Sequence, residues 1–172
     1  DKDYRDPAAM FDITSFVDYW IVNELMGNQE IKHPKSFYIH KPRGGKLTAG
    51  PVWDFDYGTL TLADAERWMV RETSMWYSRL FLSRAVRKQA RERWEALYPF
   101  LATVPDYIEA QRDYISDSAR RNQDRWPEID ISGEEVLMPN GDELLAFDEA
   151  IDRLKASYSM RLAWLDAQIR SW

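Results

Sequence analysis

Apolar residues recur at helical spacing in several stretches of the chain, with a short strand-like region after the first stretch. The first stripe occupies residues 13–25, where apolar side chains stand at relative positions 0, 3, 4, 7, 8 and 12. Asp12 or Thr14 can cap this helix, because either side chain can accept a hydrogen bond from a first-turn amide. The pattern therefore predicts a helix with one buried face.

Four more helices are predicted in the second half of the chain. A short one covers residues 74–82, the next ends near Tyr98 before Pro99, and a third ends before Trp126. The last is the longest, because apolar residues keep spacings of three and four throughout residues 147–169. We expect this helix to pack across the others.

Two segments show neither a helical nor a strand pattern. Residues 59–73 are interpreted as an ordinary surface loop, with a substrate-contacting segment as the alternative. Residues 128–140 contain Pro139 and predict a loop or a short extended excursion. The fold class that follows is α+β, mostly α-helical, with one short β-hairpin.

The predicted hairpin ends in two carboxylates. Residues 37–41 and 46–53 are expected to form strands joined by a glycine-containing turn, and Pro51 indicates an edge or a bulge. Asp54 and Asp56 come next, and side chains at i and i+2 of an extended chain share one face. They can converge on one Mg²⁺ or Mn²⁺, since hard cations prefer oxygen ligands. Taken alone, the pair is better explained by Asp54 capping a turn and Asp56 being solvated, because Asp-x-Asp occurs by chance in many acidic proteins.

A polar loop at residues 27–36 precedes this hairpin and carries Glu30. The resulting order is a buried helix, a loop with a carboxylate, a hairpin and an aspartate ready to bind metal. Protein kinases use the same order in their larger lobe, where the loop supplies a base and the later aspartate holds Mg²⁺ on ATP. The loop therefore becomes a candidate for the catalytic position.

Several blocks of the sequence resemble the C-terminal half of the CotH kinase-like family, named after spore coat protein H. A Trp-Asp-Phe-Asp run at residues 53–56 is the most specific of them. The others are residues 15–25, 28–30, 35–41 and 44–47, together with a helical tail around 80–81, 93–94, 122–127 and 161–166. The resemblance thus covers nearly the whole chain.

The resemblance implies the large-lobe portion of an atypical protein kinase, secreted or on the cell surface, that phosphorylates serine in a partner protein. It implies ATP with Mg²⁺ or Mn²⁺ as cofactors, Asp54 and Asp56 as metal ligands, Asn28 and Ser36 as cofactor contacts, and Glu30 as the catalytic carboxylate. The partners it implies are nucleotide and a protein substrate or surface protein.

Two positions depart from the family pattern. Glu30 stands where the family usually carries aspartate, and Ser36 stands where many members carry asparagine. A displacement of about 1 Å at a reacting group can lower a rate roughly a hundredfold. A degenerate kinase-like domain that binds without catalysis is therefore one alternative. A surface module that binds ligand through its aromatic residues is another.

A kinase-like ATP site also requires a phosphate-covering loop and a lysine that pairs with the phosphates. The seven glycines form no Gly-x-Gly-x-x-Gly pattern. We therefore expect residues 1–172 to form a single domain that is the C-terminal part of a larger kinase-like domain, with the N-terminal lobe preceding Asp1. The isolated chain is then expected to be catalytically silent.

Composition narrows the range of partners. A formal net charge of −6, with 30% charged residues, argues against a nucleic-acid binder that neutralises phosphates. The chain has no run of 18 apolar residues, so no membrane span is predicted, and it has no cysteine for a disulfide or a cysteine-based zinc site. The two histidines, His33 and His40, are too separated for a zinc site.

Eight tryptophans suggest a carbohydrate platform, but Trp20, Trp94 and Trp164 fall on or beside apolar stripes and are expected in the core.

Overall fold

The computed structural model describes residues 8–32, 35–126 and 145–172. It is mostly α-helical, with one two-stranded antiparallel sheet in the described part, as the sequence predicts. The predicted excursion at residues 128–140 and His33 lie outside the described residues. In chain order the elements are α2 (Ile13–Met26), η1 (Glu30–Lys32), β1 (Ile39–His40), β2 (Thr48–Ala49), η2 (Leu62–Asp64), α3 (Met75–Leu80), α4 (Arg84–Leu101), α5 (Val104–Arg125) and α6 (Phe147–Arg170).

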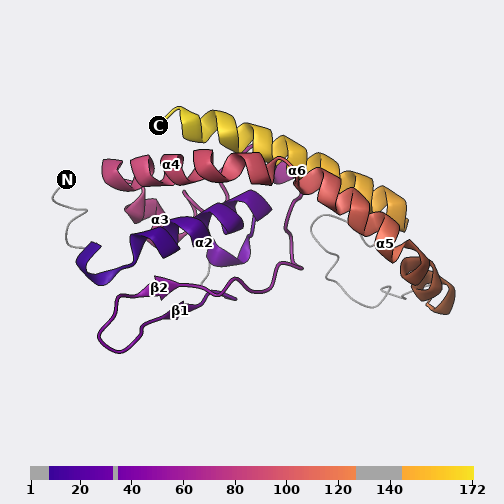
Figure 1. Ribbon diagram of the computed structural model, residues 1–172, viewed down its shortest axis with the longest axis horizontal. Helices are drawn as coiled ribbons and strands as arrows, with labels where there is room; N and C mark the ends of the chain where they lie inside the picture. The colour runs from indigo at the N-terminus through magenta and orange to yellow at the C-terminus, as the bar shows by residue number, and fades with distance from the viewer. Residues whose placement is uncertain (1–7, 33–34, 127–144) are drawn as a thin grey trace.

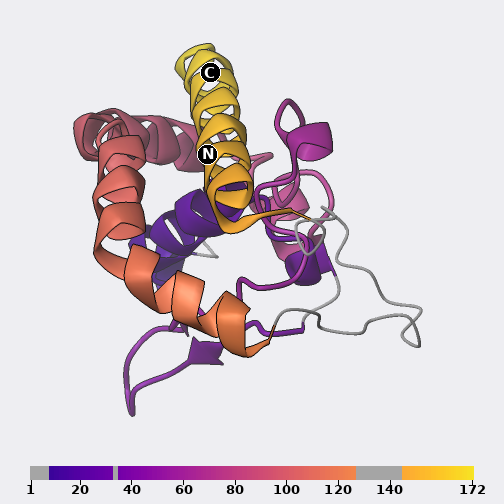
Figure 2. The ribbon, with the colours of Figure 1, turned by 90° about the vertical axis from the view of Figure 1, so that its right-hand side faces the viewer.

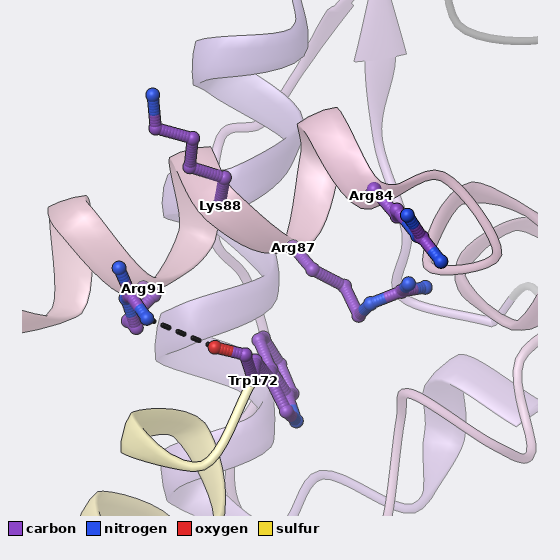
Figure 3. A pocket seen from close by; sticks show the side chains of 5 residues that line it. All are labelled: Arg84, Arg87, Lys88, Arg91 and Trp172. Carbon is purple, nitrogen blue, oxygen red and sulfur yellow. Dashed lines mark hydrogen bonds between the residues drawn. The ribbon is translucent and has the colours of Figure 1, made fainter. Parts of the chain in front are cut away.

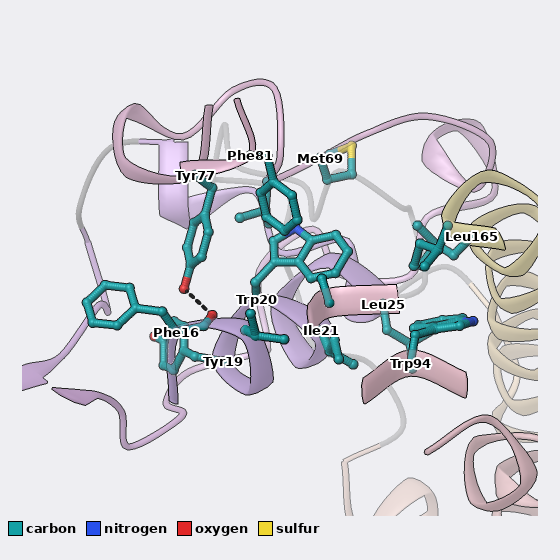
Figure 4. Packing of buried hydrophobic residues seen from close by; sticks show 14 of the residues in the cluster. Phe16, Tyr19, Trp20, Ile21, Leu25, Met69, Tyr77, Phe81, Trp94 and Leu165 are labelled. Carbon is teal, nitrogen blue, oxygen red and sulfur yellow. Dashed lines mark hydrogen bonds between the residues drawn. The ribbon is translucent and has the colours of Figure 1, made fainter. Parts of the chain in front are cut away.

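Helix α2 is the centre of the molecule. It lies between the hairpin on one side and α4 and α6 on the other (Figure 1). Asp12 caps it, and its carboxylate accepts from the Ser15 amide at 3.3 Å. Trp20, in the middle of the helix, is completely buried, with its ring centroid 4.5 Å from that of Phe81 (Figure 4). The predicted apolar stripe is confirmed as core.

The hairpin is shorter than predicted. Ile39 pairs with Ala49 and His40 with Thr48, and the ladder stops there. Gly50 has a φ of 120°, which only glycine adopts easily, and Pro51 has no N–H for a ladder hydrogen bond. The prediction of a strand reaching residue 53 is therefore wrong, and the two aspartates lie in irregular chain beyond the sheet.

Helices α4 and α6 pack against α2 and against each other, and α5 follows α4 and packs along α6 (Figure 2). Helix α4 continues through Pro99 to Leu101, whereas the sequence predicts an end before the proline. Proline removes only one hydrogen bond here, close to the end of the helix, so the last turn still forms. Val86, Ala90 and Trp94 are fully buried against α2 and α6.

Helix α5 extends away from the core. None of its residues is buried, although its predicted bounds are nearly those observed. It packs along α6 through charged side chains: Arg112 pairs with Asp152 at 2.9 Å, and Lys155 pairs with Glu109. Polar contacts of this kind join the first half of α5 to α6.

The tryptophans serve mainly as packing groups. Trp20 and Trp94 are completely buried and Trp164 is half-buried, its ring centroid 5.0 Å from that of Trp68. These rings are therefore not available as an exposed platform for carbohydrate. Among the described residues, no helix is long and apolar enough to cross a membrane.

Candidate functional site

The end of α2 delivers the polar loop predicted to carry the catalytic group. Gly27 ends the helix at a φ of 65°, and its amide donates to the Glu24 carbonyl at 3.1 Å. Asn28 follows and is buried. Its side-chain NH₂ group donates to the Asn23 side-chain oxygen at 3.0 Å, and its side-chain oxygen accepts from the backbone amide of Glu30 at 2.9 Å. Asn28 thus braces the loop and positions the backbone of Glu30.

Three hydrogen bonds join the end of α2 and this loop to the chain that follows the aspartates. The Leu60 amide donates to the Met26 carbonyl at 2.8 Å. The Gln29 side chain donates to the Gly58 carbonyl at 3.4 Å and to Asp64 at 3.1 Å. The segment that carries Asp54 and Asp56 is therefore held at both ends, by the hairpin before it and by this loop after it. The charge of Glu30 contributes to the raised pKa of Asp54.

Asp54 is the centre of a small cluster of polar side chains. Its φ is 62°, a left-handed conformation that aspartate tolerates better than most residues. Ser36, also left-handed at a φ of 51°, donates its hydroxyl to the Asp54 carboxylate at 3.3 Å. Both aspartates are exposed, and Ser36 is half-buried. The cluster therefore faces solvent and can admit a large charged ligand.

The carboxylates in this cluster affect one another. The Asp56 carboxyl raises the pKa of Asp54, chiefly by sharing a hydrogen bond with it and also by charge repulsion, and loss of hydration adds to the rise. The Ser36 hydroxyl acts in the opposite direction, and the more distant charge of Glu30 raises this pKa slightly further. The two aspartates can both be ionised more easily when a cation lies between them.

The donor set fits Mg²⁺ or Mn²⁺ better than a metal that needs a full protein cage. Within residues 8–32, 35–126 and 145–172, no group of three histidine, aspartate or glutamate side chains is close enough to hold a metal. Mg²⁺ commonly takes only one or two carboxylates from the protein and completes its shell with water and phosphate oxygens. Asp54 and Asp56 supply that number.

Exposed aromatic side chains lie beside the carboxylates. Trp53 is 57% exposed and Tyr38 is 47% exposed, and their rings meet edge to face with centroids 6.3 Å apart. Val52, next to Trp53, is also exposed. This apolar surface adjoins Asp54 in the chain, so a ligand that reaches the carboxylates can also contact a ring.

A buried charged pair that the sequence did not predict lies at the end of α2, next to the loop that carries Glu30. Glu24, in the last turn of α2, accepts hydrogen bonds from the amides of Met69 and Arg71, each at 2.6 Å. Arg161 of α6 donates to the Glu24 carboxylate at 2.8 Å and to the carbonyls of Glu24 and Asp64 at 2.7 and 2.8 Å. Three separate segments are joined at one point, directly before the loop that carries Glu30.

This pair also corrects the interpretation of residues 59–73 as an ordinary surface loop. Met69 and Val70 are buried, and the Glu24 carboxylate binds their amides. A signal for the pair was present in the sequence: Glu24 and Arg161 both occupy positions on or beside apolar helical stripes, where an unpaired charge is unfavourable. Their mutual contact could be known only from the fold.

Of the predicted site residues, Asp54, Asp56 and Ser36 come together, and Glu30 acts on Asp54 only through its charge. Asn28 is buried behind the loop, and its proposed contact with a cofactor stays a prediction, as do the individual roles of the other four.

The family model described as CotH kinase protein matches residues 3–165 of the chain. Neither the curated proteins nor the solved structures compared with the chain gave a match.

Proposed function

The chain belongs to the CotH kinase family, and on that premise we propose that it carries the metal-binding side of a site that transfers phosphate from ATP to serine in a partner protein. The observation that carries the proposal is the close approach of Asp54 and Asp56 beside Ser36 and within the field of Glu30. These residues fit the few-ligand coordination that Mg²⁺ adopts with nucleotide phosphates.

In this proposal Asp54 is the principal ligand and Asp56 the second. When bound, Mg²⁺ or Mn²⁺ supplies positive charge at the phosphate oxygens. The Ser36 hydroxyl, which donates to Asp54 at 3.3 Å, holds that carboxylate in one orientation and leaves its remaining lone pairs for the cation. Glu30 accepts the proton of the substrate serine, and Asn28 fixes the backbone from which Glu30 projects.

The same premise bears on the domain organisation. We propose that residues 1–172 form the large-lobe portion of the kinase-like domain, and that the lysine and the phosphate-covering loop come from a preceding lobe. The open, exposed position of Asp54 and Asp56 supports this, because a nucleotide bound there needs a second surface to enclose it. ATP and metal are therefore expected to bind most tightly to the full-length protein.

A second candidate function is a kinase-like domain that binds a partner without catalysis. Two observations favour it. Glu30 is one methylene longer than the aspartate expected at its position, and the exposed pair of Trp53 and Tyr38 provides an apolar contact surface beside the carboxylates. A module of this kind keeps the loop and the hairpin and loses only the proton-accepting geometry.

Metal binding and phosphate transfer separate these functions. Mn²⁺ binding to the full-length protein, measured by electron paramagnetic resonance with and without ATP, is expected to require Asp54 in both cases. Asp54→Asn tests the ligand, and Asp113→Asn, an exposed carboxylate on α5, is the matched control. Transfer of labelled γ-phosphate to protein serine supports the enzyme. Metal-dependent ATP binding without transfer supports the non-catalytic module. Mn²⁺ binding that Asp54→Asn leaves unchanged contradicts the metal-binding role and with it the enzyme.

A further inference from the structure

A basic groove lies on α4, away from the carboxylates. Arg84, Arg87, Lys88 and Arg91 line a cavity of about 370 Å³ together with Trp172, which follows α6 (Figure 3). The four cationic residues are spaced 0, 3, 4 and 7 along the helix, so they share one face. We call this surface the α4 groove. Helix α2 separates α4 from the hairpin that leads to Asp54 (Figure 1).

Positive charge in the α4 groove is only partly balanced. Glu92 approaches Lys88, and Glu95 approaches Arg91, each at 3.7 Å. Among the residues that the structure describes, no carboxylate pairs with Arg84. Arg87 donates to the carbonyls of Phe81 and Leu82, which carry no net charge. A protein whose formal net charge is −6 therefore concentrates cations at one place.

This arrangement is unfavourable for the helix itself. Arg84 and Arg87 occupy the first turn of α4, which contains no acidic residue. The N-terminal end of a helix carries partial positive charge, so cations there are repelled and anions are stabilised. A bound anion would relieve this repulsion, and the helix end would add to the attraction exerted by the arginines.

Trp172 forms a rigid wall of the groove. Its ring stacks on Trp68 with centroids 5.6 Å apart and lies 5.4 Å from the ring of Phe81. Its backbone carbonyl accepts from Arg91 at 2.9 Å (Figure 3). The ring is packed inward and does not project from the surface. A concave basic site with a fixed aromatic wall suits an inserted side chain better than a flat lipid surface.

We propose that the α4 groove binds an anionic peptide segment of a partner protein, through its carboxylates or phosphoserines. Arginine clusters recognise such groups by charge-assisted, often bidentate hydrogen bonds. Arg84 and Arg87 extend toward the same side in Figure 3 and both line the cavity, so one anionic group can contact both, while Lys88 points away from Trp172. The site needs neither ATP nor metal, and so goes beyond the proposed phosphate transfer.

The test is fluorescence anisotropy with short labelled peptides, without ATP or metal. Three peptides share one sequence and carry serine, glutamate or phosphoserine at two positions. Arg84→Glu with Lys88→Glu reverses two charges while avoiding the structural contacts of Arg87 and Arg91. Arg120→Glu with Arg121→Glu, both exposed on α5, is the matched control for net charge. Thermal unfolding establishes that each variant is folded.

We expect the wild type and the α5 control to bind the phosphoserine and glutamate peptides, and the serine peptide at least tenfold more weakly. The α4 variant should lose at least tenfold in affinity for both anionic peptides. Binding should weaken steeply with added salt. Equal binding of all three peptides, or equal loss in both double variants, would overturn the proposal. So would binding to vesicles of anionic lipid with no binding to either anionic peptide.

Discussion

Glu24 and Arg161 form an ion pair at 2.8 Å in which both side chains are only 1% exposed. The pair connects α2 to α6, two helices that are far apart in the sequence. Burial lowers the pKa of Arg161, while the charge of Glu24 and its hydrogen bond act in the opposite direction. The pair is stabilised by the backbone groups that both side chains also bind, because these satisfy their remaining hydrogen-bonding capacity.

Arg161→Ala is expected to destabilise the protein by about 3–5 kcal/mol, since it leaves the Glu24 carboxylate buried without its cation. The free energy of unfolding measured in urea checks this. Arg120→Ala is the control, because Arg120 pairs with Asp117 on the surface of α5, and its loss should change stability by less than about 1 kcal/mol. Similar values for both variants would mean that Glu24 is hydrated after all.

Two positions on the apolar stripe of α6 should respond differently to truncation. Leu162 is 6% exposed and Ile151 is half-buried. Leu162→Ala should destabilise by roughly 2–5 kcal/mol through loss of burial and a residual cavity. Ile151→Ala should cost about half as much, because its site is open on one side and can be filled by solvent. Chemical unfolding of both variants gives the comparison, and a larger effect at Ile151 would contradict it.

Tyr158 should make stability depend on high pH. Burial raises the pKa of Tyr158 to about 12 from 10.0, and its hydroxyl donates to the Leu101 carbonyl at 2.8 Å. The folded state thus favours the protonated phenol. This contribution is complete below pH 10 and is lost as pH rises toward 12. In Tyr158→Phe the decline of the melting temperature over that interval should be reduced. An unchanged decline would assign it to other groups.

Asp54 should affect metal binding and stability in opposite ways. Its raised pKa means that the folded state favours protonated Asp54, so this contribution to stability is lost as pH rises through the folded pKa. Asp54→Asn should therefore leave the melting temperature at neutral pH unchanged or slightly higher. Mn²⁺ binding should fall as pH decreases, beginning above the ordinary aspartate value of 3.8. Marked destabilisation by Asp54→Asn would contradict this assignment.

Phosphate transfer tests the proposed roles directly. In the full-length protein, Asp54→Asn should lower ATP-dependent autophosphorylation on the order of a hundredfold or more, since charge at the transferring group is worth several kcal/mol. Asp56→Asn should have a smaller effect.

Glu30→Gln distinguishes a working base from a residue that has lost its role. It should lower the rate while leaving Mn²⁺ binding intact. Equal transfer by the wild type, Asp54→Asn and Glu30→Gln at saturating metal would rule out the kinase proposal.

Much of the site could be anticipated from residues close in sequence. The spacing of Asp54 and Asp56 predicts that they meet, and the loop before the hairpin predicts a carboxylate nearby. They do not meet as neighbours on one face of an extended strand, as the spacing predicted. The chain leaves the strand at Gly50 and turns through a left-handed Asp54. Ser36 joins the cluster through its own left-handed turn, a conformation that neither residue type nor spacing indicates for serine.

The sequence alone determined where the long helices lie, that Asp12 or Thr14 caps the first of them, and the family, because these depend on apolar periodicity and local side-chain chemistry. Only the tertiary structure decided which charges are buried together and which remain in solvent. Glu24 and Arg161 are stable in the core because each finds the other and several backbone groups across distant segments. Arg84 and its neighbours on α4 form a groove only because Trp172 packs against them from the far end of the chain.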